Sequence, residues 1–129
     1  MADRIVAVVD DLFFLAKIQQ TALQLNVAVE AVHPDALESS LASGGASAVL
    51  LDLNHRSGAA IDVLNALKGD PKTRSVPVVA FLSHVQADLA QAARAAGCDI
   101  VLARSAFSQQ LPSLLKKLSG KEASELPNP

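Results

Sequence analysis

Three aspartates follow two short apolar runs of the chain and could together bind a cation. Asp10 and Asp11 come directly after residues 5–9, and Asp52 comes directly after residues 48–51. In an open parallel sheet, reactive groups gather at the carboxyl ends of the strands, so two neighbouring runs would bring these carboxylates into one cleft. Oxygen ligands without His or Cys suit a hard ion, and carboxylates completed by a backbone carbonyl and waters suit Mg²⁺. The spacing therefore predicts a magnesium site that contains Asp10, Asp11 and Asp52.

A magnesium site of this kind can accept a phosphoryl group. The metal neutralises the incoming phosphate, while a carboxylate at a strand end attacks it and forms an aspartyl phosphate. Asp52, the carboxylate at the end of its strand, is the natural nucleophile. A purely structural role is harder to assign to it, because an Asp that follows four apolar strand residues is costly to bury without a partner or a function. The alternative is structural, since Asp10 or Asp11 could cap a helix that begins at Leu12.

Five short apolar runs alternate with longer amphipathic stretches and are predicted to be buried strands. They span residues 5–9, 27–32, 48–51, 76–82 and 100–102. Their continuous apolar character indicates that both faces of the sheet are covered. The sequence therefore predicts a doubly wound α/β fold in three layers, with a parallel sheet between helices. We expect one domain over residues 1–119 and a loose tail over residues 120–129.

The amphipathic stretches predict five helices. The first, at residues 12–25, turns one stripe inward that consists of Phe14, Leu15, Ile18, Ala22 and Leu25. Pro34 can start a second helix that runs to about Ala42, and a third carries Ile61, Leu64 and Leu67 and stops before Pro71. The fourth spans about residues 86–96. The fifth spans about residues 108–118, with Ser108 as its N-cap, Pro112 in its first turn and an inward stripe of Leu111, Leu114, Leu115 and Leu118.

Composition narrows the class of protein. The formal charge is −2, and the chain has four Phe but no Tyr or Trp. Without a basic run or stacking rings, we expect no direct contact with nucleic acid. The apolar run at residues 5–9 is too short for a signal peptide core or a membrane span, so we expect a cytoplasmic protein without a membrane partner. The single Cys98 fits a reducing compartment.

In the order and spacing of these residues, the sequence resembles the receiver domain of two-component response regulators over residues 4–118. Asp10 and Asp11 match the family's acidic pair, Asp52 its phosphoacceptor, and Asn54 the residue whose backbone carbonyl binds the metal. Residues 68–77 and 95–99 look like the family's leads into its fourth and fifth strands.

The resemblance implies a fold, a cofactor and partners. The fold would be a flavodoxin-like five-stranded parallel sheet of order 2-1-3-4-5, and the cofactor Mg²⁺. The chain would signal rather than turn over a metabolite. A sensor histidine kinase or a phosphotransfer protein would phosphorylate Asp52, and a downstream protein partner would receive the signal.

Three positions depart from the family. Its phosphate-binding Thr or Ser is Leu82 here, and Ser83 could serve only if the strand end shifts by one residue. Its Lys is Arg104, whose planar fork could bind phosphate or could instead lock onto Asp52 or Asp11. The position of the family's switching aromatic residue is Val101 here, so the usual activation switch is absent or depends on other residues.

These departures keep a second hypothesis open, a degenerate pseudo-receiver that binds partners without phosphorylation. It would use the fourth helix, the fifth strand and the fifth helix, which carry Ala87, Ala90, Ala95 and Ala103. The same elements are a candidate homodimer surface. A third hypothesis, a flavin or dinucleotide enzyme, is opposed because residues 10–13 contain no Gly-rich phosphate loop.

Three histidines, His33, His55 and His84, each follow a predicted strand and so belong to the rim that carries the carboxylates. A zinc or proton role is conceivable for them. Exposed loop histidines are the alternative, because no ligand-type spacing supports a site.

Overall fold

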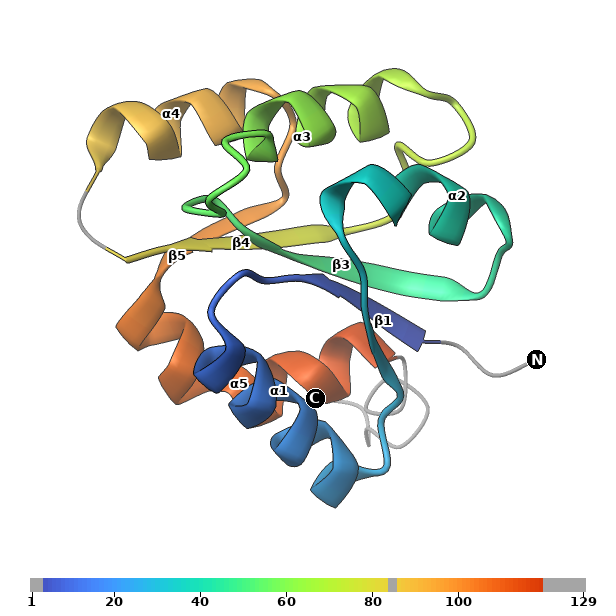
Figure 1. The fold of residues 1–129 in the computed structure, drawn as a ribbon, viewed down its shortest axis with the longest axis vertical. Helices are drawn as coiled ribbons and strands as arrows, with labels where there is room; N and C mark the ends of the chain where they lie inside the picture. The colour runs from blue at the N-terminus through green and yellow to red at the C-terminus, as the bar shows by residue number, and fades with distance from the viewer. Residues whose placement is uncertain (1–3, 84–85, 120–129) are drawn as a thin grey trace, which may run out of the picture.

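The computed structural model describes residues 4–83 and 86–119, which form a parallel sheet between two layers of helices (Figure 1). The strand order is β2-β1-β3-β4-β5, which confirms the predicted doubly wound topology. The strands are β1 (Arg4–Val8), β2 (Val29–Ala31), β3 (Ala46–Asp52), β4 (Val78–Leu82) and β5 (Ile100–Ala103). His84 and the predicted tail at residues 120–129 lie outside the described residues.

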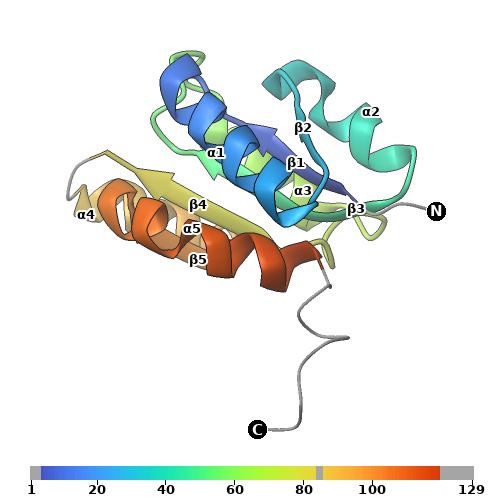
Figure 2. The ribbon, with the colours of Figure 1, turned by 90° about the horizontal axis from the view of Figure 1, so that it is seen from below.

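The helices divide between the two faces of the sheet. In Figure 1, α2, α3 and α4 cover one face, and α1 and α5 cover the other. Figure 2, which views the molecule from below, shows α1 and α5 side by side in front of the strands. The helices are α1 (Leu12–Leu25), α2 (Leu37–Ala42), α3 (Ala60–Gly69), α4 (Ala87–Ala95) and α5 (Arg104–Ser119), with the 3₁₀ turn η1 (Pro34–Ala36) before α2.

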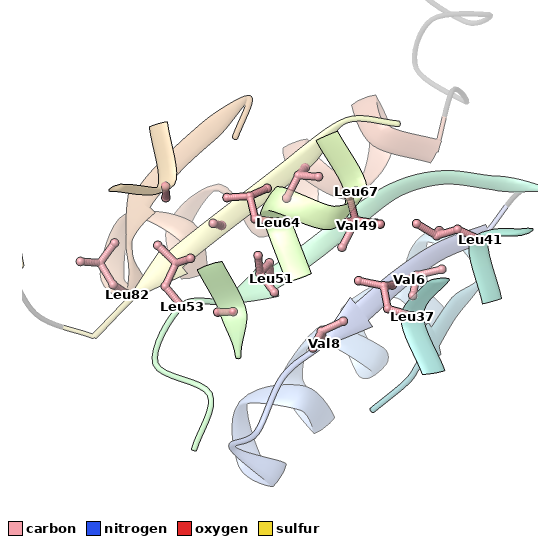
Figure 3. Close-up of a cluster of buried hydrophobic side chains, with 14 residues drawn as sticks. Val6, Val8, Leu37, Leu41, Val49, Leu51, Leu53, Leu64, Leu67 and Leu82 are labelled. Atoms are coloured by element: carbon pink, nitrogen blue, oxygen red, sulfur yellow. The ribbon is translucent and has the colours of Figure 1, made fainter. Parts of the chain in front are cut away.

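Alternate residues of the strands contribute their side chains to two apolar cores, one on each face of the sheet. Val6, Val8, Val49 and Leu51 face α2 and α3, where Figure 3 shows them with the leucines of those helices. Their neighbours along the strands, such as Leu50, pack on the opposite side against α1 and α5. Successive strand side chains point to opposite faces, so a sheet covered on both sides needs apolar residues at every position. This requirement explains the unbroken apolar runs.

The helix predicted at residues 34–42 is wrong in its first turn. Residues Pro34–Ala36 form a 3₁₀ turn, and the α-helix begins only at Leu37. The turn is capped by His33, whose Nδ1 accepts a hydrogen bond from the backbone N–H of Asp35 at 3.4 Å. Pro34 thus starts a tight turn rather than a regular helix.

The predicted start of the fifth helix is also wrong. α5 begins at Arg104, directly after β5, so Ser108 is not its N-cap and Pro112 lies inside the helix. Phe107 explains the earlier start, because it is completely buried and extends the apolar stripe of Leu111 and Leu115 by one turn. Ser108 instead accepts a hydrogen bond from Lys17 Nζ of α1. Within residues 4–83 and 86–119, no helix is long and apolar enough to cross a membrane.

Candidate functional site

The predicted acidic residues lie at the carboxyl ends of two adjacent strands. β1 pairs with β3 in parallel, with Val8 opposite Leu51, so the two strand ends lie side by side. Asp10 and Asp11 follow β1, and Asp52 is the last residue of β3. The backbone N–H of Asp10 reaches Asp52 Oδ2 at 3.3 Å. The structure therefore places both acidic segments at one edge of the sheet.

Asp52 is held by backbone groups rather than by a cation. Its side chain is buried at 4% exposure. Oδ1 accepts a hydrogen bond from the backbone N–H of Asn54 at 2.9 Å, and Oδ2 accepts the one from Asp10. Among residues 4–83 and 86–119, Asp52 forms no ion pair. Two amide dipoles thus stabilise and orient this carboxylate.

Asp10 pairs with Arg56, a residue that the sequence reasoning missed. Asp10 Oδ2 accepts hydrogen bonds from Arg56 Nε at 2.9 Å and from the backbone N–H of Arg56 at 3.3 Å. The hydrogen bond from the guanidinium lowers the pKa of Asp10 below its ordinary value. The available signal was a cation four residues after Asp52, in the loop at the same edge of the sheet.

Asp11 caps α1, which confirms the capping role that was the alternative to metal binding for this residue. Its Oδ1 accepts hydrogen bonds from the backbone N–H groups of Phe13 at 2.9 Å and Phe14 at 3.1 Å. Its Oδ2 lies 3.3 Å from Arg104 Nη1. The Phe14 N–H bond first, and the charge of Arg104 next, lower the pKa of Asp11.

Arg104 lies on an aromatic cluster beneath the acidic residues. Its guanidinium carbon is 4.4 Å from the ring centroid of Phe14 and 5.9 Å from that of Phe81. Phe107 completes the cluster, with its ring centroid 4.6 Å from that of Phe81. Stacking of this kind fixes a planar guanidinium where an ammonium would stay mobile. In the described residues Arg104 pairs with Asp11 and not with Asp52.

The end of β4 does not shift to bring Ser83 into the strand. Leu82 is the last residue of β4, pairs with Ala103 and is buried at 4% exposure. Ser83 follows, and both its backbone N–H and its hydroxyl donate to Asn54 Oδ1, at 2.7 Å and 3.1 Å. Asn54 Nδ2 donates in turn to Gln86 Oε1 at 2.9 Å. The Asn54 side chain therefore ties the loop after β3 to the segment before α4.

The donor chemistry of this edge fits a hard cation, although its side chains are turned to other partners. Asp10, Asp11, Asp52 and the backbone carbonyl of Asn54 offer only oxygen ligands, as Mg²⁺ prefers. Within residues 4–83 and 86–119, however, no three His, Cys, Asp or Glu side chains form a group that could hold a metal ion. Arg56 and Arg104 supply positive charge in its place.

Two of the three histidines come close to each other. The ring centroids of His33 and His55 are 6.1 Å apart. His55 Nδ1 accepts a hydrogen bond from the backbone N–H of Ser57 at 3.2 Å, as His33 does from that of Asp35. Each imidazole ring therefore stabilises the loop in which it lies.

An open hollow borders the acidic residues. It has a volume of 650 Å³ and is lined by Asp10, Asp11, Leu12, Phe13 and Arg56. Leu12 is 76% exposed and Phe13 is 91% exposed. The acidic residues are therefore accessible from solvent through this hollow.

Similarity to known proteins is confined to structure. No protein-family model matches the sequence, and no curated protein matches it significantly. The phosphorylated cyanobacterial phytochrome response regulator RcpA is 22% identical, with a TM-score of 0.75 over 100% of this chain and 99% of that one. A putative response regulator from Chloroflexus aurantiacus is 14% identical, with a TM-score of 0.80 over 93% of this chain and 99% of that one.

The response regulator Rcp1, solved in its Mn²⁺-bound form, is 19% identical, with a TM-score of 0.73 over 98% of this chain and 99% of that one. All three solved structures match almost their whole length. The strand order agrees with that of the family that the sequence resembles. The chain has the fold of response regulator receiver domains.

Proposed function

We propose that this chain is a signalling receiver that accepts a phosphoryl group on Asp52. The observation that carries the proposal is the pairing of the three carboxylates, since within residues 4–83 and 86–119 Asp10 and Asp11 form ion pairs with arginines and Asp52 forms none. An anionic oxygen without a cationic partner is the best nucleophile of the three. The N–H groups of Asp10 and Asn54 hold that carboxylate in place at the end of β3.

The remaining residues are proposed to act around this nucleophile. Mg²⁺, held by Asp10, Asp11, Asp52 and the backbone carbonyl of Asn54, would neutralise the charge of the incoming phosphoryl group. An oxygen of Asp52 forms the new bond to phosphorus, and the leaving group departs with the electrons of the old bond. Arg104 is the candidate donor to the phosphoryl oxygens, because the condition for Ser83 to serve, a shift of the end of β4 by one residue, is not met.

The proposed donor is a sensor histidine kinase or a phosphotransfer protein in the cytoplasm, and the proposed output is contact with a downstream protein. The phosphorylated state of RcpA and the Mn²⁺-bound form of Rcp1 support this chemistry by analogy of fold. The chain would then signal and catalyse at most its own phosphorylation and dephosphorylation.

Intact-mass measurement after incubation with acetyl phosphate and Mg²⁺ tests the proposal. The wild type should gain the mass of one phosphoryl group, and Asp52→Asn should gain none. A wild type that stays unlabelled while a control receiver is labelled would contradict it, as would equal labelling of Asp52→Asn.

A second candidate function is that of a pseudo-receiver, and the buried Leu82 favours it. Leu82 offers no hydroxyl to a phosphoryl group, and Val101 on β5 offers no ring that could swing inward. A groove of 240 Å³ between α4 and β5 could take a partner, and its lining includes Leu82, Ala87, Ala90 and Val101. This surface, with α5, is also the proposed homodimer surface. Loss of signalling in cells on Asp52→Ala, with the protein still folded, would rule out a phosphate-independent adaptor.

A further inference from the structure

The guanidinium of Arg56 is hydrogen-bonded to Asp10, a carboxylate that a divalent cation would need as a ligand. We propose that Arg56 is an internal counter-ion that competes with a divalent cation for Asp10 and so sets the metal affinity of this edge. The inference rests on the metal site of the proposed function and names the residue that regulates it.

The contact between the two residues is specific. Asp10 Oδ2 accepts from both the side-chain Nε and the backbone N–H of Arg56, at 2.9 Å and 3.3 Å. Charge-assisted bonds of this kind are stronger than neutral ones, and here both fall on one carboxylate oxygen. A metal ligated by that oxygen has to displace the guanidinium.

The side chain of Arg56 can also move away from Asp10. Its side chain is 84% exposed, and within the described residues the contact with Asp10 is its only ion pair. Exposed ion pairs contribute little stability and exchange readily with water and salt. The competition is therefore reversible.

Arg104 provides the contrast within the same site. Its side chain is 32% exposed, lies on Phe14 and Phe81, and pairs with Asp11, which α1 already uses as its cap. These contacts hold Arg104 in place whether or not a metal is present. Of the two arginines, Arg56 is thus the one that a metal can displace.

The expected size of the effect follows from charge. Competition from a positive charge paired with Asp10 would weaken the binding of a doubly charged ion by roughly threefold to tenfold at low salt. The effect shrinks as ionic strength rises, because both charges are near solvent.

Titration with Mn²⁺, with the free ion followed by electron paramagnetic resonance, tests the inference without any phosphorylation. Arg56→Met keeps the aliphatic stem and should raise the affinity roughly threefold to tenfold at low salt. Arg56→Lys, which restores the charge, should bring it back toward wild type. Arg74→Met is the matched control, because Arg74 is an exposed arginine just before β4 and its loss changes the net charge equally.

Equal affinities of wild type and Arg56→Met would overturn the inference, as would an equal gain in Arg74→Met or no binding by any variant. Failure of the proposed function gives a different result. In that case Arg56→Met binds Mn²⁺ more tightly than wild type, yet neither protein gains phosphoryl mass from acetyl phosphate.

Discussion

The three carboxylates at the edge of the sheet are chemically identical but have three different sets of partners. Asp11 accepts hydrogen bonds from the start of α1, Asp10 accepts them from Arg56, and Asp52 accepts them from two backbone N–H groups. In the part of the chain that the structure describes, only Asp52 of the three lacks a cationic partner. The division of roles among the aspartates therefore comes from their neighbours and not from their residue type.

Asp11→Ala should destabilise the protein more than Asp11→Asn. The alanine leaves the N–H groups of Phe13 and Phe14 without their acceptor, whereas asparagine retains an oxygen that can cap the helix. We expect the thermal midpoint to fall by about 4 °C for alanine and by less for asparagine. Circular dichroism melts measure this, and equal midpoints for the two variants would show that the cap is unimportant.

The stability supplied by the charge of Asp11 should be lost only in acid. Because its pKa is lowered in the folded protein, the folded state binds a proton at Asp11 less readily than the unfolded chain does. The charge therefore contributes fully above the ordinary value of 3.8, and its contribution disappears as the pH falls through the lower folded pKa. The stability gap between wild type and Asp11→Asn should be constant from pH 7 to about 5 and should narrow below 3.8. Urea unfolding across this range measures the gap; a gap that widens in acid would contradict the assignment.

At the residue scale, the sequence predicted that the acidic residues follow neighbouring strands, but it did not predict all of their hydrogen-bond and ion-pair partners. Acidic residues directly after apolar strands could be recognised from spacing alone, and the capping alternative for Asp11 was confirmed. The pairing of Arg104 with Asp11 was one of the two partners proposed for this arginine, but the pairing of Asp10 with Arg56 was missed, because the two residues lie 46 positions apart along the chain. Such pairs depend on the packing of loops, which has no periodic signal in the sequence.

Among the elements, α5 shows how a tertiary contact overrides a local signal. Pro112 and Ser108 favoured a helix start near residue 108, yet burial of Phe107 against Phe81 carries the helix back to Arg104. Phe107 lies four residues before Leu111, so the stripe was readable from the sequence, but proline was the stronger local signal. The earlier start also places Arg104 on the aromatic cluster.

Pro112→Ala should stabilise the protein, because proline inside α5 lacks the N–H that would bond to the preceding turn. We expect a gain of roughly 1–3 kcal/mol in the free energy of unfolding, because alanine has a higher helix propensity than proline. The gain is smaller than the full difference in propensity, because the unfolded chain has more conformational freedom with alanine than with proline. Urea unfolding measures it, and Ser113→Ala, an exposed neighbour, is the control. A loss of stability in Pro112→Ala would mean that the helix does not run through this residue.

Lys68 joins three elements near the opposite edge of the sheet. Its Nζ donates to the carbonyls of Arg74 and Val76 and to Asp99 Oδ2, at 3.0, 2.9 and 2.9 Å, and its side chain is only 13% exposed. Lys68→Met should lower the free energy of unfolding by about 2 kcal/mol, because these acceptors lose their shared donor. Lys72→Met, at an exposed position, should be nearly neutral. Equal effects of the two substitutions in guanidinium unfolding would contradict this role.

For the molecule as a whole, the pattern of apolar runs predicted the three-layer α/β architecture, and the family resemblance implied the strand order. Runs buried on both faces require a covered parallel sheet, and the order β2-β1-β3-β4-β5 places the ends of β1 and β3 together. Leu82 at the end of β4 is buried in the core on the side of α3 and α4, and Val101 of β5 packs against that core. The fold thus presents an acidic edge, while the chemistry at that edge depends on a few side chains.

Reductive trapping locates the phosphoryl group most directly. Borohydride converts an aspartyl phosphate to homoserine, which peptide mass spectrometry assigns to a position in the chain. After incubation with acetyl phosphate and Mg²⁺, the account predicts homoserine at the position of Asp52 and nowhere else. Homoserine at Asp10 or Asp11, or none in a folded protein, would contradict it.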